Sequence, residues 1–218
     1  MISPDLISLW VTFKLAVTST LILVVLGLPL AWWLARTSWR GRFVIEALVA
    51  LPIVLPPTVL GFYLLSAMSE TGLPGMRGLA FSFSGIVVGS VLYSLPFVVQ
   101  PMVSAFRLLS DELLESAAVL GANAWRRFIW VALPGARGGV VTAAALGFAH
   151  TVGEFGVVLM LGGNLPGETQ TASVRIYELV EQIDFDAAGR LSLTLLAVSV
   201  VLILVIYGVS QSRTRGRL

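Results

Sequence analysis

Long apolar windows alternate with short polar segments along the whole chain. Five windows of about twenty residues carry almost no charge, and they cover residues 15–35, 47–67, 85–106, 140–161 and 191–207. Each window is long enough to cross the hydrocarbon core of a bilayer as a helix, which satisfies its own backbone hydrogen bonds in lipid. The pattern predicts an all-α, polytopic membrane protein with five transmembrane helices.

The composition agrees with this pattern and limits the number of domains. Of the 218 residues, 57% are hydrophobic and 12% are charged, which is too apolar for a soluble domain. No repeat, linker or low-complexity segment divides the chain. We therefore expect residues 1–218 to form one transmembrane domain with two long loops, at 107–139 and 162–190. The first window is expected to stay as a helix, because it is too long for a signal peptide and Asp5 precedes it.

The arginines indicate which loops face the cytoplasm. Three polar segments hold most of them: Arg36, Arg40 and Arg42; Arg107, Arg126, Arg127 and Arg137; Arg213, Arg215 and Arg217. The alternate gaps hold Arg77 in one and, in the other, Arg175 and Arg190 among a larger number of acidic residues. The positive-inside rule then places the N terminus outside, and the C terminus and the 107–139 loop in the cytoplasm. This placement explains the net charge of +2 without nucleic acid.

The 107–139 loop has helical signals of its own. Leu113, Ala117 and Leu120 recur at helical spacing, and Gly121 follows as a residue that ends helices with a positive φ. Asn123 is a suitable N-cap for a second short helix, which Pro134 would end. The pattern predicts a short helix, a glycine turn and another short helix, either as a docking site for a partner or as a simple connection lying on lipid headgroups.

Residues of this loop match a known pattern. Glu115, Ala117, Gly121, Val131, Leu133 and Pro134 have the spacing of the loop that importer-type ABC permeases present to their ATPases. Ser116 departs from the usual Ala by one small residue for another. The chain thus resembles the binding-protein-dependent importer permease family, and the resemblance assigns these seven residues to an ATPase-coupling loop.

Three further segments resemble the molybdate permease branch of that family: residues 50–57 (ALPIVLPP), 153–156 (GEFG) and 164–171 (NLPGETQT). The resemblance implies a multi-pass protein of the bacterial inner membrane that pairs with a second copy of itself. It also implies a cytosolic ABC ATPase dimer and a periplasmic or lipid-anchored oxyanion-binding protein that delivers molybdate. Sulfate, thiosulfate and tungstate stay open as alternative substrates.

The chain has no means of hydrolysing ATP. Its only lysine is Lys14, so no phosphate-cradling Gly-Lys-Ser/Thr loop exists, and no catalytic triad or metal-ligand set is visible. We expect a transporter subunit rather than an enzyme. It would carry no cofactor, with ATP and Mg on the partner ATPase.

Polar groups inside the windows are candidates for the pore or a gate. Thr58 follows two prolines that remove amide donors and disturb the second span, and His150 and Glu154 lie four residues apart and therefore on one face of the fourth span. His150 and Glu154 would form a gate, a dimer-interface hydrogen bond or a structural contact, or else the relay of a proton-coupled transporter. The full candidate set is Thr58, His150, Thr151, Gly153, Glu154, Phe155 and Gly156.

The 162–190 loop is expected outside. It begins with turn residues and continues into a surface helix in which Ile176, Leu179, Val180 and Ile183 share a face. By resemblance, its turn would meet the binding protein through Asn164, Pro166, Gly167, Glu168 and Thr169.

Overall fold

The computed structural model describes residues 3–215, and this part of the chain is helical and contains no strand. The elements are α1 (Pro4–Arg36), α2 (Arg42–Val54), α3 (Pro57–Met68), α4 (Phe83–Arg107), α5 (Asp111–Val119), α6 (Ala124–Arg127), the π-helical turn η1 (Phe128–Ala132), α7 (Leu133–Val152), α8 (Gly156–Gly162), α9 (Ala172–Glu181) and α10 (Phe185–Arg215). The prediction of an all-α fold is confirmed.

Four stretches are long and apolar enough to cross a membrane: α1, α4, α6 to α7, and α10. The pair α2 and α3 makes a fifth if it counts as one span, although the two helices meet at 110°. The predicted span over residues 47–67 is therefore not one helix but two, interrupted at the prolines that were expected to disturb it. Leu55 and Pro56 both adopt extended backbone conformations between the helices, because a residue that precedes a proline is pushed out of the α region.

Two other predicted limits are also wrong. α1 begins at Pro4, well before residue 15, since Ser3 caps it and accepts a hydrogen bond from the Leu6 amide. The fourth window is divided, because α7 ends at Val152 and α8 begins only at Gly156. Hydropathy does not detect this second break, since the residues on both sides of it are apolar.

The core lies where α1, α4 and α7 pack together. Leu23 of α1 and Val98, Met102 and Phe106 of α4 are fully buried in one cluster, which Ala143 of α7 joins. Small residues on α7 allow the helices to approach closely, as is typical of membrane helix pairs. The short helices and loops at the two ends of the molecule are attached to this three-helix core.

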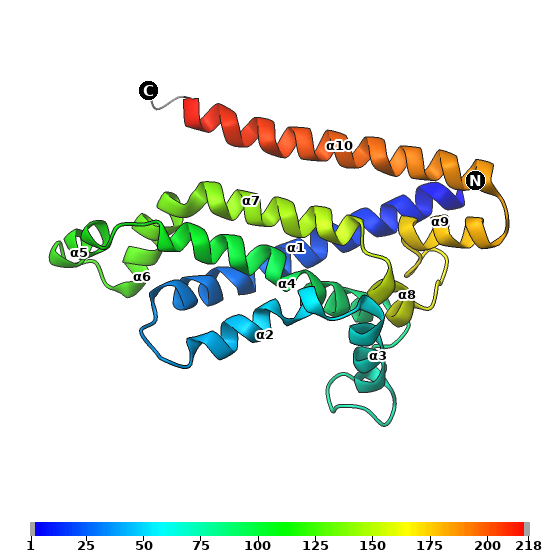
Figure 1. Cartoon of the computed structure of the whole chain (residues 1–218), viewed down its shortest axis with the longest axis horizontal. Helices are drawn as coiled ribbons and strands as arrows, with labels where there is room; N and C mark the ends of the chain where they lie inside the picture. The colour runs from blue at the N-terminus through cyan, green and yellow to red at the C-terminus, as the bar shows by residue number, and fades with distance from the viewer. Residues whose placement is uncertain (1–2, 216–218) are drawn as a thin grey trace.

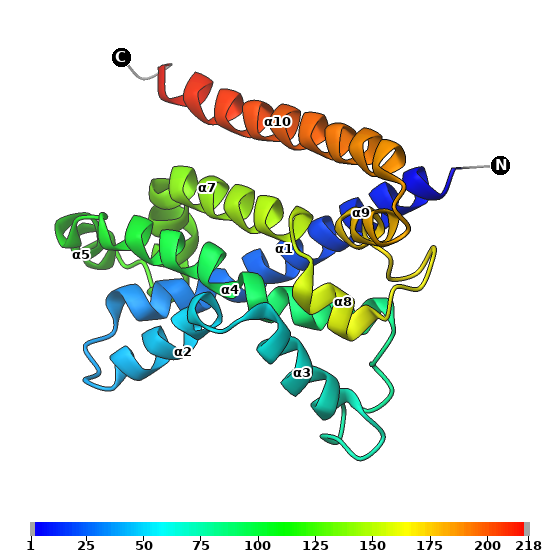
Figure 2. The same cartoon turned by 45° about the vertical axis from the view of Figure 1, so that its right-hand side comes forward.

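The short elements gather at opposite ends of the long helices. Figure 1 shows α5 and α6 at one end, and α8, α9 and the start of α1 at the other. α10 lies along the outside and contacts α7 and α9, while α3 packs on α8 and points away from α2 (Figure 2). The loops predicted to be cytoplasmic and external thus lie at opposite ends of the molecule. Which end faces the cytoplasm stays a prediction.

Candidate functional site

The first candidate region is the hairpin of residues 111–132, formed by α5, α6 and η1. α5 ends at a turn in which Gly121 has a φ of 84° and the amide of Ala122 donates to the carbonyl of Ala117 at 3.0 Å. Asn123 then caps α6, because its side chain accepts from the Arg126 amide at 2.9 Å. The predicted helix, glycine turn and second helix are confirmed.

The predicted end of the second helix is wrong. Pro134 does not end it. Instead, η1 carries the chain directly into α7, and Pro134 lies in the first turn of α7. Proline has no amide to donate to the preceding turn, and the π-helical turn directly before it accommodates the missing hydrogen bond. The hairpin is therefore joined rigidly to a long helix of the core.

The hairpin presents its tip outward and buries its base. Val119 and Leu120, beside the turn, are 87% and 86% exposed, and Trp125 is exposed nearby. Leu114 and Phe128, by contrast, are buried in the same cluster as Phe106. Of the residues predicted for coupling, Glu115, Ser116, Gly121 and Pro134 are exposed, whereas Ala117, Val131 and Leu133 are half-buried. The tip is thus open at the surface of the protomer, and the base packs against α1 and α4.

Arg36 ties this hairpin to the membrane helices, a role that sequence analysis missed. Its guanidinium donates to the carbonyls of Phe106 and Leu109 at 2.8 and 2.9 Å and pairs with Asp111 at the start of α5. It thus satisfies carbonyls at the end of α4 and holds the first residue of the hairpin. Its contacts reach more than sixty positions along the chain. The sequence could therefore show only that Arg36 follows an apolar span.

We expect Arg36→Met to destabilise this end of the molecule by about 2 kcal/mol, because charge-assisted hydrogen bonds to the two carbonyls are lost. The thermal unfolding midpoint of the purified protein is expected to fall by about 4–8 °C. Arg40→Met is the matched control, since Arg40 is exposed and forms no ion pair in the described part of the chain. Equal midpoints for the two variants would contradict a structural role for Arg36.

The second candidate region is the break between α7 and α8. His150 is held firmly: its ring stacks on Phe97 with centroids 3.9 Å apart, and its Nδ1 lies 2.9 Å from the hydroxyl oxygen of Ser94. Ser94 is also 3.1 Å from the hydroxyl of Thr151. Glu154 lies beyond the helix end, so the prediction that His150 and Glu154 share a helix face is wrong. The glycines at 153 and 156 favour the break, since both lower helix propensity.

The candidate pore residues divide into an inner and an outer group. Thr151 and Glu154 are buried within the protomer, and His150, Phe155 and Gly156 are half-buried. Thr58 and Gly153 are exposed. The start of α8 lies against the start of α3, because a Cβ at Gly156 would lie 2.8 Å from the Cβ of Pro57, the residue before Thr58. Only the outer group is exposed at the surface of the protomer.

The third candidate region is the turn at residues 163–169, at the opposite end from the hairpin. Gly163, Asn164 and Gly167 all have a positive φ. Thr169 is 1% exposed, and its hydroxyl donates to the carbonyl of Gly162 at 2.6 Å while it accepts from the Leu165 amide at 3.1 Å. Thr169 therefore supports the turn from inside, whereas Pro166, Gly167 and Glu168 are exposed on it.

Helix α9 follows this turn and is tied to the start of α1. Arg175 bonds Glu178 at 2.9 Å and pairs with Asp5 at 3.5 Å. Burial lowers the pKa of Arg175, but its hydrogen bonds to Glu178 and Asp5 and their charges raise it above the ordinary value overall. The predicted helix exists but ends at Glu181, so Ile183 lies beyond it, exposed and with a φ of 62°.

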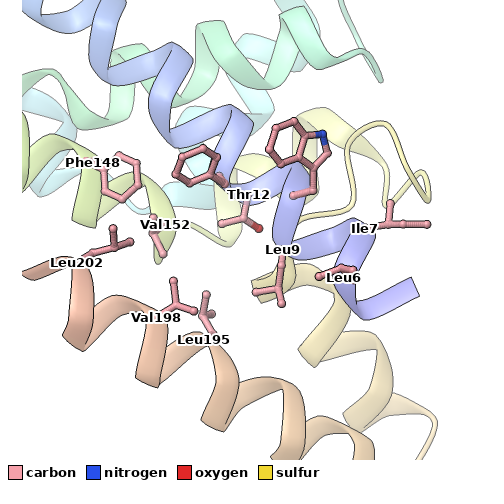
Figure 3. Close-up of a pocket in the computed structure, with 11 residues that line it drawn as sticks. Leu6, Ile7, Leu9, Thr12, Phe148, Val152, Leu195, Val198 and Leu202 are labelled. Atoms are coloured by element: carbon pink, nitrogen blue, oxygen red, sulfur yellow. The ribbon is translucent and has the colours of Figure 1, made fainter. Parts of the chain in front are cut away.

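A large apolar pocket of about 660 Å³ lies between α1, α7 and α10. Figure 3 shows Leu9 and Thr12 of α1 on one side, with Val152 of α7 and Leu195 and Val198 of α10 facing them. Among the described residues that line the pocket, Thr12 carries the one hydroxyl group. This hydroxyl already donates to the carbonyl of Ser8 and accepts from the amide of Ala172. An anion would lose its hydration here without gaining partners. This pocket is therefore no candidate for an anion path.

Together, the membrane-spanning helices, the hairpin at one end and the structured turn at the other define a polytopic membrane protein. The chain belongs to the family of binding-protein-dependent transport system inner membrane components, whose model matches residues 12–215. It is a subunit of an ABC importer and not an enzyme.

Relatives and solved structures agree with this family. The chain is 49% identical over 210 residues to the molybdenum transport system permease protein ModB of Azotobacter vinelandii, covering 93% of each protein. It is 36% identical over 202 residues to the sulfate transport system permease protein CysT of Synechocystis, covering 90% of this chain and 71% of that protein. Its fold resembles that of a bacterial alginate ABC importer, with a TM-score of 0.82 at 19% identity, over 97% of this chain and 80% of the other. It also resembles the MetNI methionine transporter, with a TM-score of 0.69 at 19% identity, over 99% of both chains.

Proposed function

We propose that this chain is the permease subunit of a molybdate importer. Two copies would form the translocation path, and ATP hydrolysis on a cytosolic ATPase dimer would switch the path between outward and inward access. The observation that supports molybdate as the substrate is the 49% identity to a molybdenum permease over 93% of each protein. The chain itself would hold no ATP or Mg.

Sequence identity supports molybdate over sulfate. The chain is 49% identical to the Azotobacter molybdenum permease and 36% identical to the Synechocystis sulfate permease. Sulfate is the second candidate, because identity to that protein is still 36%. Tungstate and thiosulfate are chemically similar tetrahedral oxyanions, so competition experiments must include them.

The two ends of the molecule suit two different partners. The exposed tip of the hairpin would dock the ATPase, and its buried base would carry movement into α4 through Phe128 and Arg36. The turn at residues 163–169 would meet the periplasmic binding protein through Pro166, Gly167 and Glu168. A proton relay through His150 is disfavoured, since its ring is stacked on Phe97 and hydrogen-bonded to Ser94.

The path would run along the exposed residues near the break rather than through the buried ones. Thr58 and Gly153 offer a hydroxyl and exposed backbone there. Neither α3 nor α8 nor the break between α7 and α8 contains a Lys or Arg, so the anion would meet no fixed cation there that holds it tightly. Selectivity would then belong to the binding protein, which suits an importer that receives its substrate already enclosed.

Uptake of labelled molybdate tests this proposal. Vesicles that hold the chain with its ATPase and binding protein are expected to take up molybdate only with ATP, and excess unlabelled tungstate is expected to suppress uptake while sulfate is not. Strong competition by sulfate would move the assignment to the sulfate branch. Uptake driven by a proton gradient without ATP would contradict the ATPase partnership.

A further inference from the structure

Among the described residues, Glu154 is the one charged residue that is buried. It lies in the break between α7 and α8, and its side chain is 4% exposed. Both carboxylate oxygens are shielded from solvent, and neither has a hydrogen-bond partner among the described residues. The ion pairs of this part of the molecule all involve other residues. An isolated buried carboxylate is strongly disfavoured, because it loses its hydration and gains nothing in return.

A polar neighbour that has no partner of its own lies on α4. Ser90 is fully buried, and its hydroxyl also has no partner of good geometry, although it lies close enough to Glu154 to interact. Two unpartnered groups side by side can satisfy one another after a small side-chain rotation. A carboxylic acid that donates to one hydroxyl is then adequately solvated, whereas a carboxylate that accepts from one hydroxyl is not.

No cation on the neighbouring helices turns toward Glu154. On α4 the titratable neighbour is Tyr93, and on α7 it is His150, whose ring centroid lies 4.9 Å from that of Tyr93. α3 and α8 carry no charged residue.

The charged groups of α1 and α9 are occupied elsewhere. Lys14 of α1 is exposed and lies 4.1 Å above the ring of Phe83. On α9, Arg175 pairs with Glu178 and Asp5, and Tyr177 donates to Glu181. Nothing near Glu154 therefore compensates a negative charge.

We infer that Glu154 carries a proton in the folded protein and that its neutral carboxyl group donates a hydrogen bond to Ser90. This bond fixes the α7–α8 break against α4. Glu154 is then a positioning residue: it holds the break beside exposed Gly153, where Gly156 approaches Pro57, and it neither binds the anion nor relays protons. The inference rests on burial and packing and does not depend on which anion is transported.

Infrared spectroscopy of the purified protein in detergent tests the protonation directly. The wild-type protein is expected to show the carbonyl stretching band of a protonated carboxylic acid from mildly acidic to mildly alkaline pH. Glu154→Gln is expected to lose this band and to keep the thermal unfolding midpoint, because the amide is a neutral isostere that can also donate to Ser90. Glu70→Gln is the matched control, since Glu70 is exposed and its substitution should leave this band in place.

A second pair of variants tests the hydrogen bond itself. Ser90→Ala removes the acceptor, so the acid band is expected to move to higher frequency while the protein stays folded. Glu154→Ala is expected to lower the unfolding midpoint by several degrees, because it leaves a cavity and strands Ser90. The inference is overturned if the wild-type protein lacks the acid band at neutral pH, if Glu154→Gln unfolds, or if Ser90→Ala leaves the band unmoved.

Discussion

Gly121→Asp is expected to leave the protein folded and to abolish ATP-driven uptake. Gly121 has a φ of 84°, and a Cβ at this position would meet no atom within 4 Å. Inside the protomer the substitution therefore costs only about 1–2 kcal/mol of left-handed backbone strain. The new carboxylate would project from the exposed tip of the hairpin into the surface of the ATPase. An unpaired charge there costs about 2–5 kcal/mol, so the affinity for the ATPase is expected to fall by at least about thirtyfold.

Gly75→Asp is the matched control for this experiment. Gly75 has a φ of 89° and equally open space, but it lies in the loop between α3 and α4 rather than on the hairpin. It should therefore suffer the same backbone strain and keep normal ATPase binding and uptake. Binding is measured by co-purification of the ATPase and by titration of the detergent-solubilised subunits. Wild-type binding by Gly121→Asp would remove the docking assignment, and equal loss in both variants would attribute the effect to strain alone.

The features that the sequence predicted correctly depend on local signals. The hairpin follows from Gly121 and Asn123, each of which acts on backbone groups within a few residues. The helical type of the long apolar segments follows from hydropathy, because a lipid environment imposes the same requirement on every turn of a helix. Such signals need no knowledge of what packs against them.

The features that were missed depend on tertiary contacts or on breaks that hydropathy does not register. Pro56 lies in an apolar window, so the 110° bend between α2 and α3 is invisible to a hydropathy average even though the backbone rule for prolines predicts it locally. Arg36 acts through residues 70 to 75 positions away. The burial of Glu154 arises only when α4 covers the α7–α8 break. The type of each residue indicated that these positions are structurally or electrostatically unusual. The contacts that each side chain makes became known only from the packing of the helices.

The close approach of α4 and α7 makes the most sensitive packing site in the core. A Cβ at Gly139 would lie 2.2 Å from the Cβ of Ala105 and 3.6 Å from its Cα. A methyl group on the backbone cannot rotate away, so the two helices must separate, and Phe106 beside Ala105 must move with them. Overpacking of this kind costs about 1–3 kcal/mol, and a longer side chain costs more. Gly139→Ala is expected to lower the unfolding midpoint, and Gly139→Leu is expected to prevent recovery of folded protein.

The neighbouring glycine separates this clash from any general effect of the substitution. A Cβ at Gly138 would meet nothing within 4 Å. Gly138→Ala should therefore stabilise α7 by about 1 kcal/mol, because alanine has the higher helix propensity. The two alanine variants differ by one position in the same helix, so their unfolding midpoints in detergent are expected to move in opposite directions. Equal stabilisation by both would mean that a Cβ at Gly139 does not clash with the Cβ of Ala105, and that the distance between them exceeds 2.2 Å. The packing of α4 against α7 in the three-helix core would then be wrong.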